Sequence, residues 1–341
     1  MLGFDLNIIW FCLVGILFIG YAILDGFDLG VGILHLLTRK DIDRRVLINS
    51  IGPIWDGNEV WLITGGGALF AAFPMVYATV FSGFYLAFIL LLMALIFRAT
   101  AIEFRSKQTQ SWWTNIWDTL FCIGSTLAAL LIGVALGNMI RGIPLTTDYE
   151  YAGTFIGLLN PFSLIIGLFV VSLFAMHGNL YLLLKTEGEL KKQIKHWLPY
   201  TTSIFIFFYF ISTVLIFSLV PRMISNFSNA PTLFIIPLAT LFVILFLIWK
   251  ENKEHYWHAF LASSIIIFLL LLTYGMGTFP YMVYSLGNAN NHLSIYNAAS
   301  SKNTLKTMLI IAAIGVPLVL IYTTLIYRVF KGKVILDKHS Y

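Results

Sequence analysis

Apolar runs long enough to cross a lipid bilayer recur along almost the whole chain, and no other feature constrains its fold as strongly. The residues are 59% hydrophobic and 11% charged, whereas soluble domains contain about 25% charged residues. A fold in water cannot bury so much apolar side chain, so lipid must be the solvent for most of the surface. We therefore expect an all-α integral membrane protein in the lipid bilayer.

The apolar runs predict about nine transmembrane helices packed in bundles, within a single polytopic membrane domain over residues 1–341. The first run is about 45 Å long at 1.5 Å per residue, against about 30 Å of hydrocarbon, so it must tilt or leave the bilayer. The second is short and contains three glycines, residues 65–67. The runs lie at 8–37, 59–73, 76–97, 116–140, 161–184, 200–220, 231–249, 257–277 and 306–329.

The basic residues predict the topology. If the spans alternate, seventeen of the 21 Lys and Arg residues lie on one side. Cytoplasmic loops carry the Lys/Arg excess, which puts the N-terminus outside and the C-terminus in the cytoplasm. Omitting the second span would reverse every later loop and remove the asymmetry. The four basic residues assigned to the outer side are Arg141, Arg222, Lys302 and Lys306.

Several functional classes find no support in the sequence. The net charge of +5 sits in short loops between apolar runs, so it sets topology and predicts no nucleic-acid partner. No signal-peptide pattern precedes the first run, and we expect Met1 to begin the mature chain. No phosphate loop, CxxC or HExxH motif occurs, and Cys12 and Cys122 stand alone, so no metal site is expected. His177, the one histidine at membrane depth, is expected to be a hydrogen-bonded bundle residue rather than a haem ligand.

Acidic residues inside the apolar runs are the candidate functional groups. Counted from Trp10, Asp25 lies roughly 22 Å and Asp28 roughly 27 Å into the bilayer, both in its cytoplasmic half. They are three residues apart and share one helix face. Asp56 and Glu59 have the same spacing at the cytoplasmic start of the second span. A carboxylate at such depth costs about 2.5–3.5 kcal/mol and marks a proton relay, an ion site or an interhelical pair.

The carboxylates also have a purely structural interpretation. Asp25 and Asp28 could hold helices together by bonding to Asn58, Arg98 or a backbone amide. Glu103 lies beside two arginines in sequence and is expected to join a surface charge network with them. Glycines 26, 30 and 32 on the first span predict close approach of another helix. Composition and spacing do not decide between the structural and the proton-carrying interpretations.

Two stretches are more specific: "LDGFDLGVG" (24–32) and "INSIGPIWDGNEVWLITGGGALFAAFPMVYATVFSGFY" (48–85). Both closely resemble subunit II of the cytochrome bd quinol oxidase family. The resemblance extends through "FRATAIEFRSK" (97–107) and "IGVALGNMIRGIPL" (132–145). Residues 1–145 therefore carry the family motifs, and 146–341 continue the helical bundle with matching length and span pattern.

The resemblance implies a non-haem subunit in the cytoplasmic (cell) membrane. Its partner, subunit I, would hold two b haems and haem d, and the complex would oxidise quinol and reduce O2 to water. This chain would ligate no haem, and would be catalytic only as part of the complex. Family members are also described with a structural quinone in subunit II. A small single-span subunit, the quinone species and the oxygen route stay open.

The resemblance also implies roles for individual residues. Asp56, the aspartate of WDGN, would feed protons from the cytoplasm toward subunit I, and Asp25 and Asp28 would lie near the subunit interface. From their depth and spacing we also expect Asp25 and Glu59 to belong to the proton pathway. The polar residues Asp28, Trp55, Asn58, Arg98 and Glu103 are assigned structural or interface roles. Two alternatives remain: a proton- or cation-coupled transporter, which acids in the first span and a glycine-interrupted second span would suit, and a scaffold that only stabilises subunit I.

The predicted topology can be tested with a reporter enzyme fused after Tyr341. A reporter that is active only outside the cytoplasm should be inactive there, and one that is active only in the cytoplasm should work, because the basic loops stay inside. The same reporters placed after Arg141 should give the opposite pattern. Activity of the outside-only reporter at the C-terminus would overturn the prediction.

Overall fold

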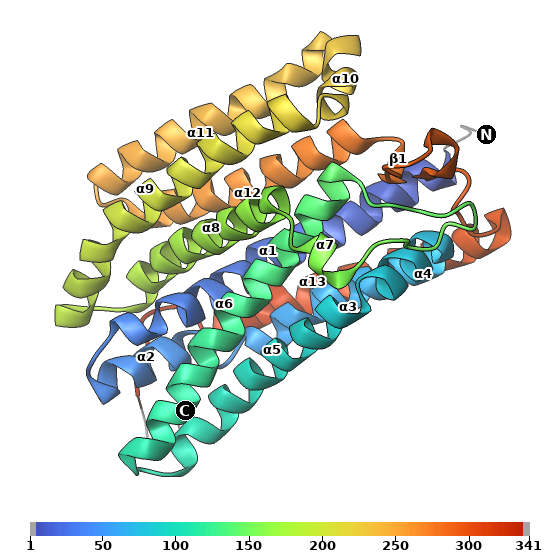
Figure 1. Ribbon diagram of the computed structural model, residues 1–341. Helices are drawn as coiled ribbons and strands as arrows, with labels where there is room; N and C mark the ends of the chain where they lie inside the picture. The colour runs from blue at the N-terminus through green and yellow to red at the C-terminus, as the bar shows by residue number, and fades with distance from the viewer. Residues whose placement is uncertain (1–4, 337–341) are drawn as a thin grey trace.

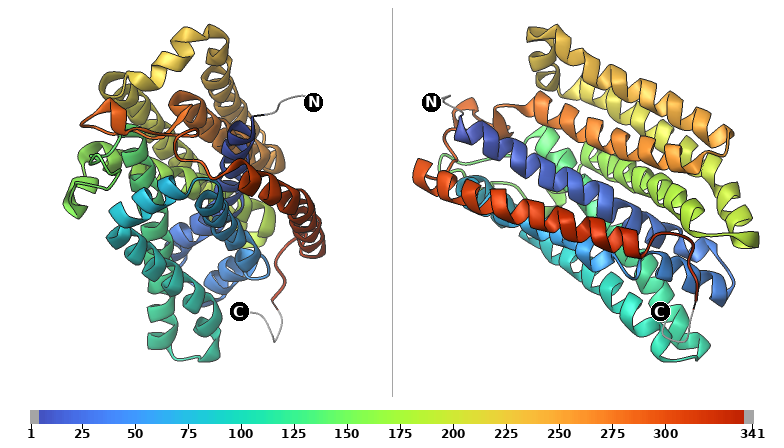
Figure 2. Two further views of the ribbon diagram at one scale, coloured as in Figure 1. Left: turned by 90° about the vertical axis from the view of Figure 1, so that its right-hand side faces the viewer. Right: turned by 180° about the vertical axis from the view of Figure 1, so that it is seen from behind.

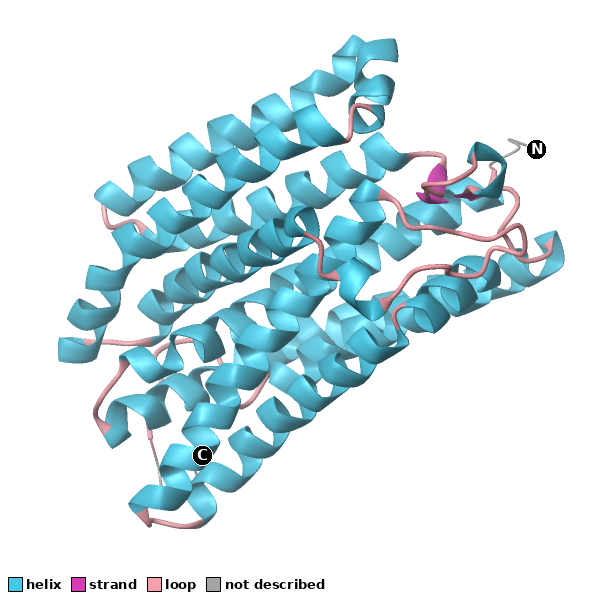
Figure 3. Ribbon diagram, viewed as in Figure 1, coloured by secondary structure: helices cyan, strands magenta, loops and turns pink. Residues whose placement is uncertain are grey.

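The computed structural model describes residues 5–336 and consists almost wholly of helices (Figure 3). The long apolar sequence runs dictate this result, because in lipid each helix satisfies its own backbone hydrogen bonds. The helices are α1 (Leu6–Leu34), α2 (Asp41–Ile51), α3 (Trp55–Ala72), α4 (Pro74–Gly83), α5 (Tyr85–Phe104), α6 (Ser111–Arg141), α7 (Phe155–Leu158), α8 (Pro161–Lys185), α9 (Gly188–Leu219), α10 (Arg222–Asn229), α11 (Ile235–Asn252), α12 (Tyr256–Thr278) and α13 (Lys302–Val329).

Eight helices in the described part of the chain are long and apolar enough to cross a membrane. The second predicted span, 59–73, corresponds to α3, which has 18 residues but a polar first turn that lowers its apolar character. The third, 76–97, is divided between α4 and α5 at Phe84. Hydrogen bonds from Phe84 to Val80 and from Phe88 to Phe84 carry the chain through that break, so α4 and α5 form one bent helical segment.

The first and last helices run in the same direction. In Figure 2, α1 and α13 start at the same end of the bundle and lie side by side, the direction that an odd number of crossings requires. At the opposite end lie α2 and the α5–α6 and α8–α9 turns (Figure 1). Together with the α11–α12 turn and the end of α13, these connections carry most of the basic residues, and we refer to this end as the basic end.

Glycines set the distance between α1 and the helices around it. A Cβ on Gly30 would come within 1.9 Å of the Phe174 carbonyl oxygen, and one on Gly32 would lie 1.9 Å from the Ser125 hydroxyl. Gly178 of α8 has the same constraint against the Gly30 backbone. The close approach predicted from these glycines is confirmed, and it brings the backbones of α1 and α8 into contact.

At the end of the bundle opposite the basic end, loops and two short strands connect the helices, and ion pairs in the part of the chain that the structure describes do not. Strands β1 (Tyr281–Val283) and β2 (Leu293–Ser294) form a two-stranded antiparallel sheet. The Trp10 indole donates a 3.0 Å hydrogen bond to the Leu305 carbonyl, which joins the start of α1 to the start of α13. Within the described residues, this end contains no ion pair, because all of those found lie at or near the basic end.

Candidate functional site

A single buried arginine gathers acidic side chains from two neighbouring helices. Arg98 of α5 is fully buried. One guanidinium nitrogen lies 2.6 Å from Asp25 Oδ1 and 3.7 Å from Asp28 Oδ2, and another lies 2.6 Å from Glu59 Oε1. The two aspartates come from α1 and the glutamate from α3. A guanidinium presents several N–H donors in a fixed fork and keeps its proton, so it can hold three carboxyl groups at once.

Local sequence explains why these side chains meet. The three-residue spacing of Asp25 and Asp28 puts both on one face of α1. Gly20 on the same helix lets α3 approach, since a Cβ there would lie 2.3 Å from the Trp61 ring. Trp55, in the first turn of α3, lies with its ring 6.0 Å from the Arg98 guanidinium carbon. Spacing therefore predicted the α1 face, whereas the arginine's place opposite it required the packing of three helices.

Asn58 links this cluster to the last helix. Its amide nitrogen donates to Asp28 Oδ2 at 2.7 Å and to the Leu24 carbonyl at 3.2 Å. Its amide oxygen accepts a 2.9 Å hydrogen bond from the Tyr327 hydroxyl. The suggestion that Arg98 and Asn58 bind the two aspartates is thus confirmed as geometry. Tyr327 was missed, because no sequence pattern connects the end of α13 with the start of α3.

The cluster holds more carboxyl groups than cations. Asp25, Asp28 and Glu59 face one arginine, so the group would carry two net negative charges if every carboxyl were ionised. Uncompensated charge in a low-dielectric interior costs several kcal/mol per ion. Asp25 Oδ2 and Asp28 Oδ1 are buried and have no hydrogen-bond partner among the described residues. These two oxygens are where the cluster can carry a proton.

The four predicted carboxylates differ in exposure. Asp25 and Asp28 are fully buried, the Glu59 side chain is 19% exposed, and Asp56, one turn earlier on α3, is exposed. These helices therefore present acids at decreasing exposure from the surface to Arg98. Asp56 itself forms no ion pair with the described residues.

The predicted surface network around Glu103 is wrong. Glu103 is exposed and forms no ion pair within residues 5–336, because the neighbouring arginines point inward to other acids. Arg105 binds Asp118 at 2.5 Å and Asp41 at 2.7 Å. Sequence proximity misled here, since residues two and five positions from Glu103 on a helix face away from it.

Asp118 is the centre of a second ion network that sequence reasoning did not identify. Besides Arg105, its carboxylate binds His35 Nε2 at 2.6 Å and Arg44 at 3.0 Å. The partners come from the end of α1, from α2 and from the end of α5. The only available signal was the number of basic residues near these helix ends. With Asp41 on Arg105, two carboxylates face two arginines, so this network is balanced in charge and joins helix ends.

No group of three potential metal ligands occurs within the described residues. His177 is fully buried, with Nδ1 2.7 Å from the Ser263 hydroxyl and Nε2 3.0 Å from the Ile23 carbonyl oxygen. Both ring nitrogens are therefore engaged in hydrogen bonds between α1, α8 and α12, as predicted for a bundle residue.

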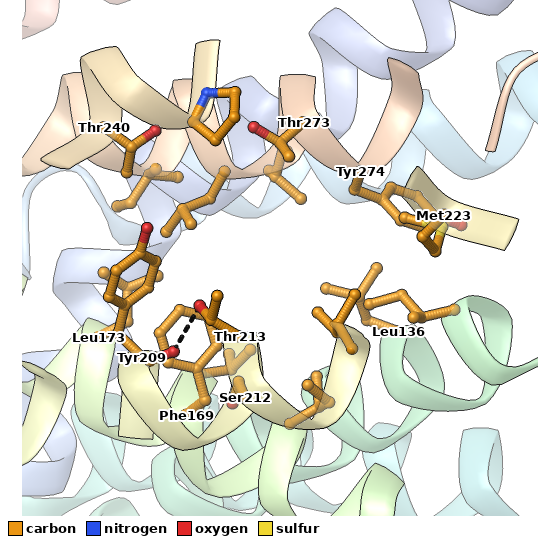
Figure 4. A pocket seen from close by; sticks show the side chains of 18 of the residues that line it. Leu136, Phe169, Leu173, Tyr209, Ser212, Thr213, Met223, Thr240, Thr273 and Tyr274 are labelled. Carbon is orange, nitrogen blue, oxygen red and sulfur yellow. Dashed lines mark hydrogen bonds between the residues drawn. The ribbon is translucent and has the colours of Figure 1, made fainter. Parts of the chain in front are cut away.

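An apolar cavity of about 220 Å³ lies on the other side of the bundle, lined by residues of α1, α6, α8, α9, α10, α11 and α12 (Figure 4). Its few polar groups are hydroxyls, among them those of Tyr209, Thr240 and Thr273. The Ser212 hydroxyl is buried there without a hydrogen-bond partner. Such a lining fits an elongated apolar molecule that carries an oxygen atom. Composition and spacing did not predict this cavity.

The sequence matches a known family over nearly its full length. The family model described as "Cytochrome bd terminal oxidase subunit II" matches residues 6–330. The chain is 39% identical to "Cytochrome bd-I ubiquinol oxidase subunit 2" of Escherichia coli K12, over 96% of this chain and 95% of that protein. It is 34% identical to "Cytochrome bd ubiquinol oxidase subunit 2" of Bacillus subtilis 168, over 97% of each chain.

The fold is also known from a solved structure. It is similar to a chain of the bd oxidase from Geobacillus thermodenitrificans, with a TM-score of 0.79, 16% identity, and coverage of 95% of this chain and 98% of that one. At this identity the likeness concerns the fold alone. The helical membrane architecture predicted from the sequence is confirmed.

Replacing Arg98 by glutamine should destabilise the protein by about 3–5 kcal/mol, because it leaves buried carboxyl groups without their cation. The measurement is thermal unfolding of the native assembly in detergent. Arg141→Gln, at an exposed arginine, is the control and should have little effect. Adding Asp25→Asn to Arg98→Gln should recover part of the loss. A melting temperature unchanged by Arg98→Gln would contradict the role given to this residue.

Proposed function

The chain belongs to the cytochrome bd terminal oxidase subunit II family, and from this premise we propose that it supports quinol oxidation and O2 reduction by carrying protons toward a haem-bearing subunit I. Membership makes it a multi-pass membrane subunit of a terminal oxidase complex. Relatives named as oxidase subunits leave the transporter alternative without support. The haems, two b and one d, belong to subunit I in this proposal.

One observation carries the proton proposal: carboxyl groups descend from the surface into the bundle in order of decreasing exposure. Asp56 is exposed, Glu59 is 19% exposed and Asp25 is fully buried. A carboxyl relays protons when both of its forms are accessible, and partial desolvation favours this. The excess of acids over cations gives the cluster a place for the proton. We propose the order Asp56, Glu59, Asp25.

Arg98 holds this route in place without relaying protons itself, because a guanidinium does not deprotonate in proteins. Glu59 and Asp25 lie on different nitrogens of the same guanidinium, so the fork fixes the two carboxyl groups on either side of one cation. A proton would pass between them through water at the edge of the guanidinium. Asp28 and Asn58 complete the cluster as structural partners.

We propose that subunit I packs against the face formed by α3 and α13 together with the first half of α1. Of the described part of α13, only Leu305 is buried, and Ile63 and Phe70 of α3 are 73% and 59% exposed. Gly66 and Gly67 on α3 have no atom within 4 Å of an added Cβ. Small residues with free space allow another helix to approach closely in a membrane. A face that contacts only lipid does not need such residues. A small single-span subunit could cover the rest.

The apolar cavity is the proposed seat of a structural quinone. An isoprenoid tail suits its aliphatic and aromatic walls, and the unpartnered Ser212 hydroxyl could donate to a quinone oxygen. Tyr209 and Thr213 line the same side (Figure 4). This quinone would be structural, since none of the charged groups described above lies among the lining residues.

Asp56→Asn should slow oxygen reduction while the haem spectrum of the complex stays normal. The substitution keeps size and hydrogen bonding but removes the titrating proton. Loss of a proton-transfer group typically costs about 10²–10⁴-fold in a general acid–base step, and a water bypass would cost less. Turnover with excess quinol is measured at pH 6–8, with Glu103→Gln as the exposed control. Full turnover across this range would exclude Asp56 from the path, and loss of haem would favour the scaffold alternative.

Filling the cavity should remove the quinone. Ser212→Phe places a ring in a cavity of about 220 Å³, so the purified complex should yield less quinone per haem on solvent extraction. Ile204→Phe, at a 50% exposed site on the same helix, should leave the content unchanged. Equal quinone in both variants would place the quinone elsewhere, and loss of a phospholipid instead would identify a lipid chain as the occupant.

A further inference from the structure

Tyr327 reaches the carboxylate cluster from a helix that barely packs on the rest of the chain. The described part of α13 has one buried residue, Leu305, at its opposite end. Tyr327 nevertheless donates a 2.9 Å hydrogen bond to Asn58, which is 1% exposed. The Tyr327 hydroxyl of α13, the Asn58 amide of α3 and the Asp28 carboxyl of α1 thus form one continuous chain of hydrogen bonds.

The tail after α13 holds this tyrosine in place. Lys333 Nζ donates to the carbonyls of Leu184 and Thr186 at 2.8 and 2.9 Å, and the Val334 amide donates to the Lys185 carbonyl. Burial, and then the charge of Lys191, lower the pKa of Lys333. These contacts tie the end of α13 to the α8–α9 turn, so the position of Tyr327 is set from outside the cluster.

The Tyr327 hydrogen bond completes the set of contacts that holds the Asn58 amide in one orientation. An asparagine side chain has an acceptor oxygen and a donor nitrogen that differ little in shape. Asp28 Oδ2 and the Leu24 carbonyl only accept, so they take the amide nitrogen. The Tyr327 O–H then donates to the amide oxygen, which has no other donor among the described residues. In the reversed orientation, the amide oxygen would face Asp28 Oδ2 and the Leu24 carbonyl oxygen, and neither of these can donate a hydrogen bond to it. Asn58 carries no proton itself, but it links the Tyr327 hydroxyl to the Asp28 carboxyl.

This orientation controls the chemistry open to Asp28. An N–H donated to a carboxyl oxygen favours the ionised form, and it reserves Oδ2 as an acceptor. Oδ1 is the oxygen without a partner in the described chain, so it is the one that a proton would occupy whenever Asp28 is neutral. A small cavity of about 20 Å³ lies beside Asn58 and Tyr327, between α3 and α13. One water needs about 10–15 Å³, so the tyrosine oxygen can also accept from water.

We propose that Tyr327 is a positioning residue for proton transfer: by locking the Asn58 amide, it favours the ionised form of Asp28 and so lets the cluster release its proton. This rests on the proposed proton role of the cluster. Without the lock, Asp28 loses part of the hydrogen bond that favours its ionised form, and the cluster binds its proton more tightly. The whole cluster then releases that proton only at higher pH.

Tyr327→Phe in the intact complex tests this, because it removes only the hydroxyl. The midpoint of the acid limb of turnover against pH should move up by about 0.5–1 unit, a three- to tenfold loss on that limb, with normal haem content. The infrared band of the protonated carboxyl should shift as well. Tyr322→Phe is the matched control: Tyr322 lies on the same helix and lines the small cavity but makes no hydrogen bond to Asn58. Its profile should equal that of the unmodified complex.

A double-mutant cycle shows whether Tyr327 acts through Asn58. Asn58→Leu should shift the profile at least as far as Tyr327→Phe, and the double variant should shift it no further than Asn58→Leu alone. Additive shifts, or a shift with Asn58→Leu and none with Tyr327→Phe, would overturn the proposal. Asp25→Asn distinguishes a failure of the proposed proton role of the cluster from a failure of the proposed role of Tyr327. If it leaves turnover intact, the proton role of the cluster fails, and if it slows turnover while Tyr327→Phe does not, only the role of Tyr327 fails.

Discussion

A buried guanidinium among carboxyl groups is the interaction on which the first half of this protein depends. Arg98 is fully buried and contacts Asp25 and Glu59 at 2.6 Å. Neither the cation nor the acids could stay at this depth alone, because an isolated charge in hydrocarbon is expensive. Together they define how α1, α3 and α5 are placed relative to one another. Lipid offers little hydrophobic force between helices, so polar contacts and close backbone approach take over that role.

The two ion networks near the basic end differ in charge balance, and that difference separates structure from function. Around Asp118, two carboxylates, Asp118 and Asp41, meet two arginines, Arg44 and Arg105. Around Arg98, three carboxyl groups share one cation. A balanced network holds helix ends together. An acid-rich one can take up a proton with little rearrangement, and it therefore supports a proton route where the Asp118 network does not.

Most of the fold and part of the site could be predicted from the sequence. Hydropathy identified the membrane helices, since a long apolar segment has no other stable form in lipid. The three-residue spacing of Asp25 and Asp28 placed both on one face, and the glycines of α1 predicted its tight packing. Local spacing could not predict the bend at Phe84 or the inward direction of Arg105. Both depend on contacts between helices, and Glu103 was misassigned for that reason.

The sequence by itself determined that this chain spans a membrane and carries acids inside it, because apolar composition and charge depth follow from residue order alone. It also carried the family motifs in residues 24–145. Only the tertiary structure decided which groups meet. Tyr327 and Asn58 are 269 positions apart, and the apolar cavity is lined by residues of seven helices. Such contacts depend on how whole helices are placed relative to one another, and no local sequence pattern predicts that placement.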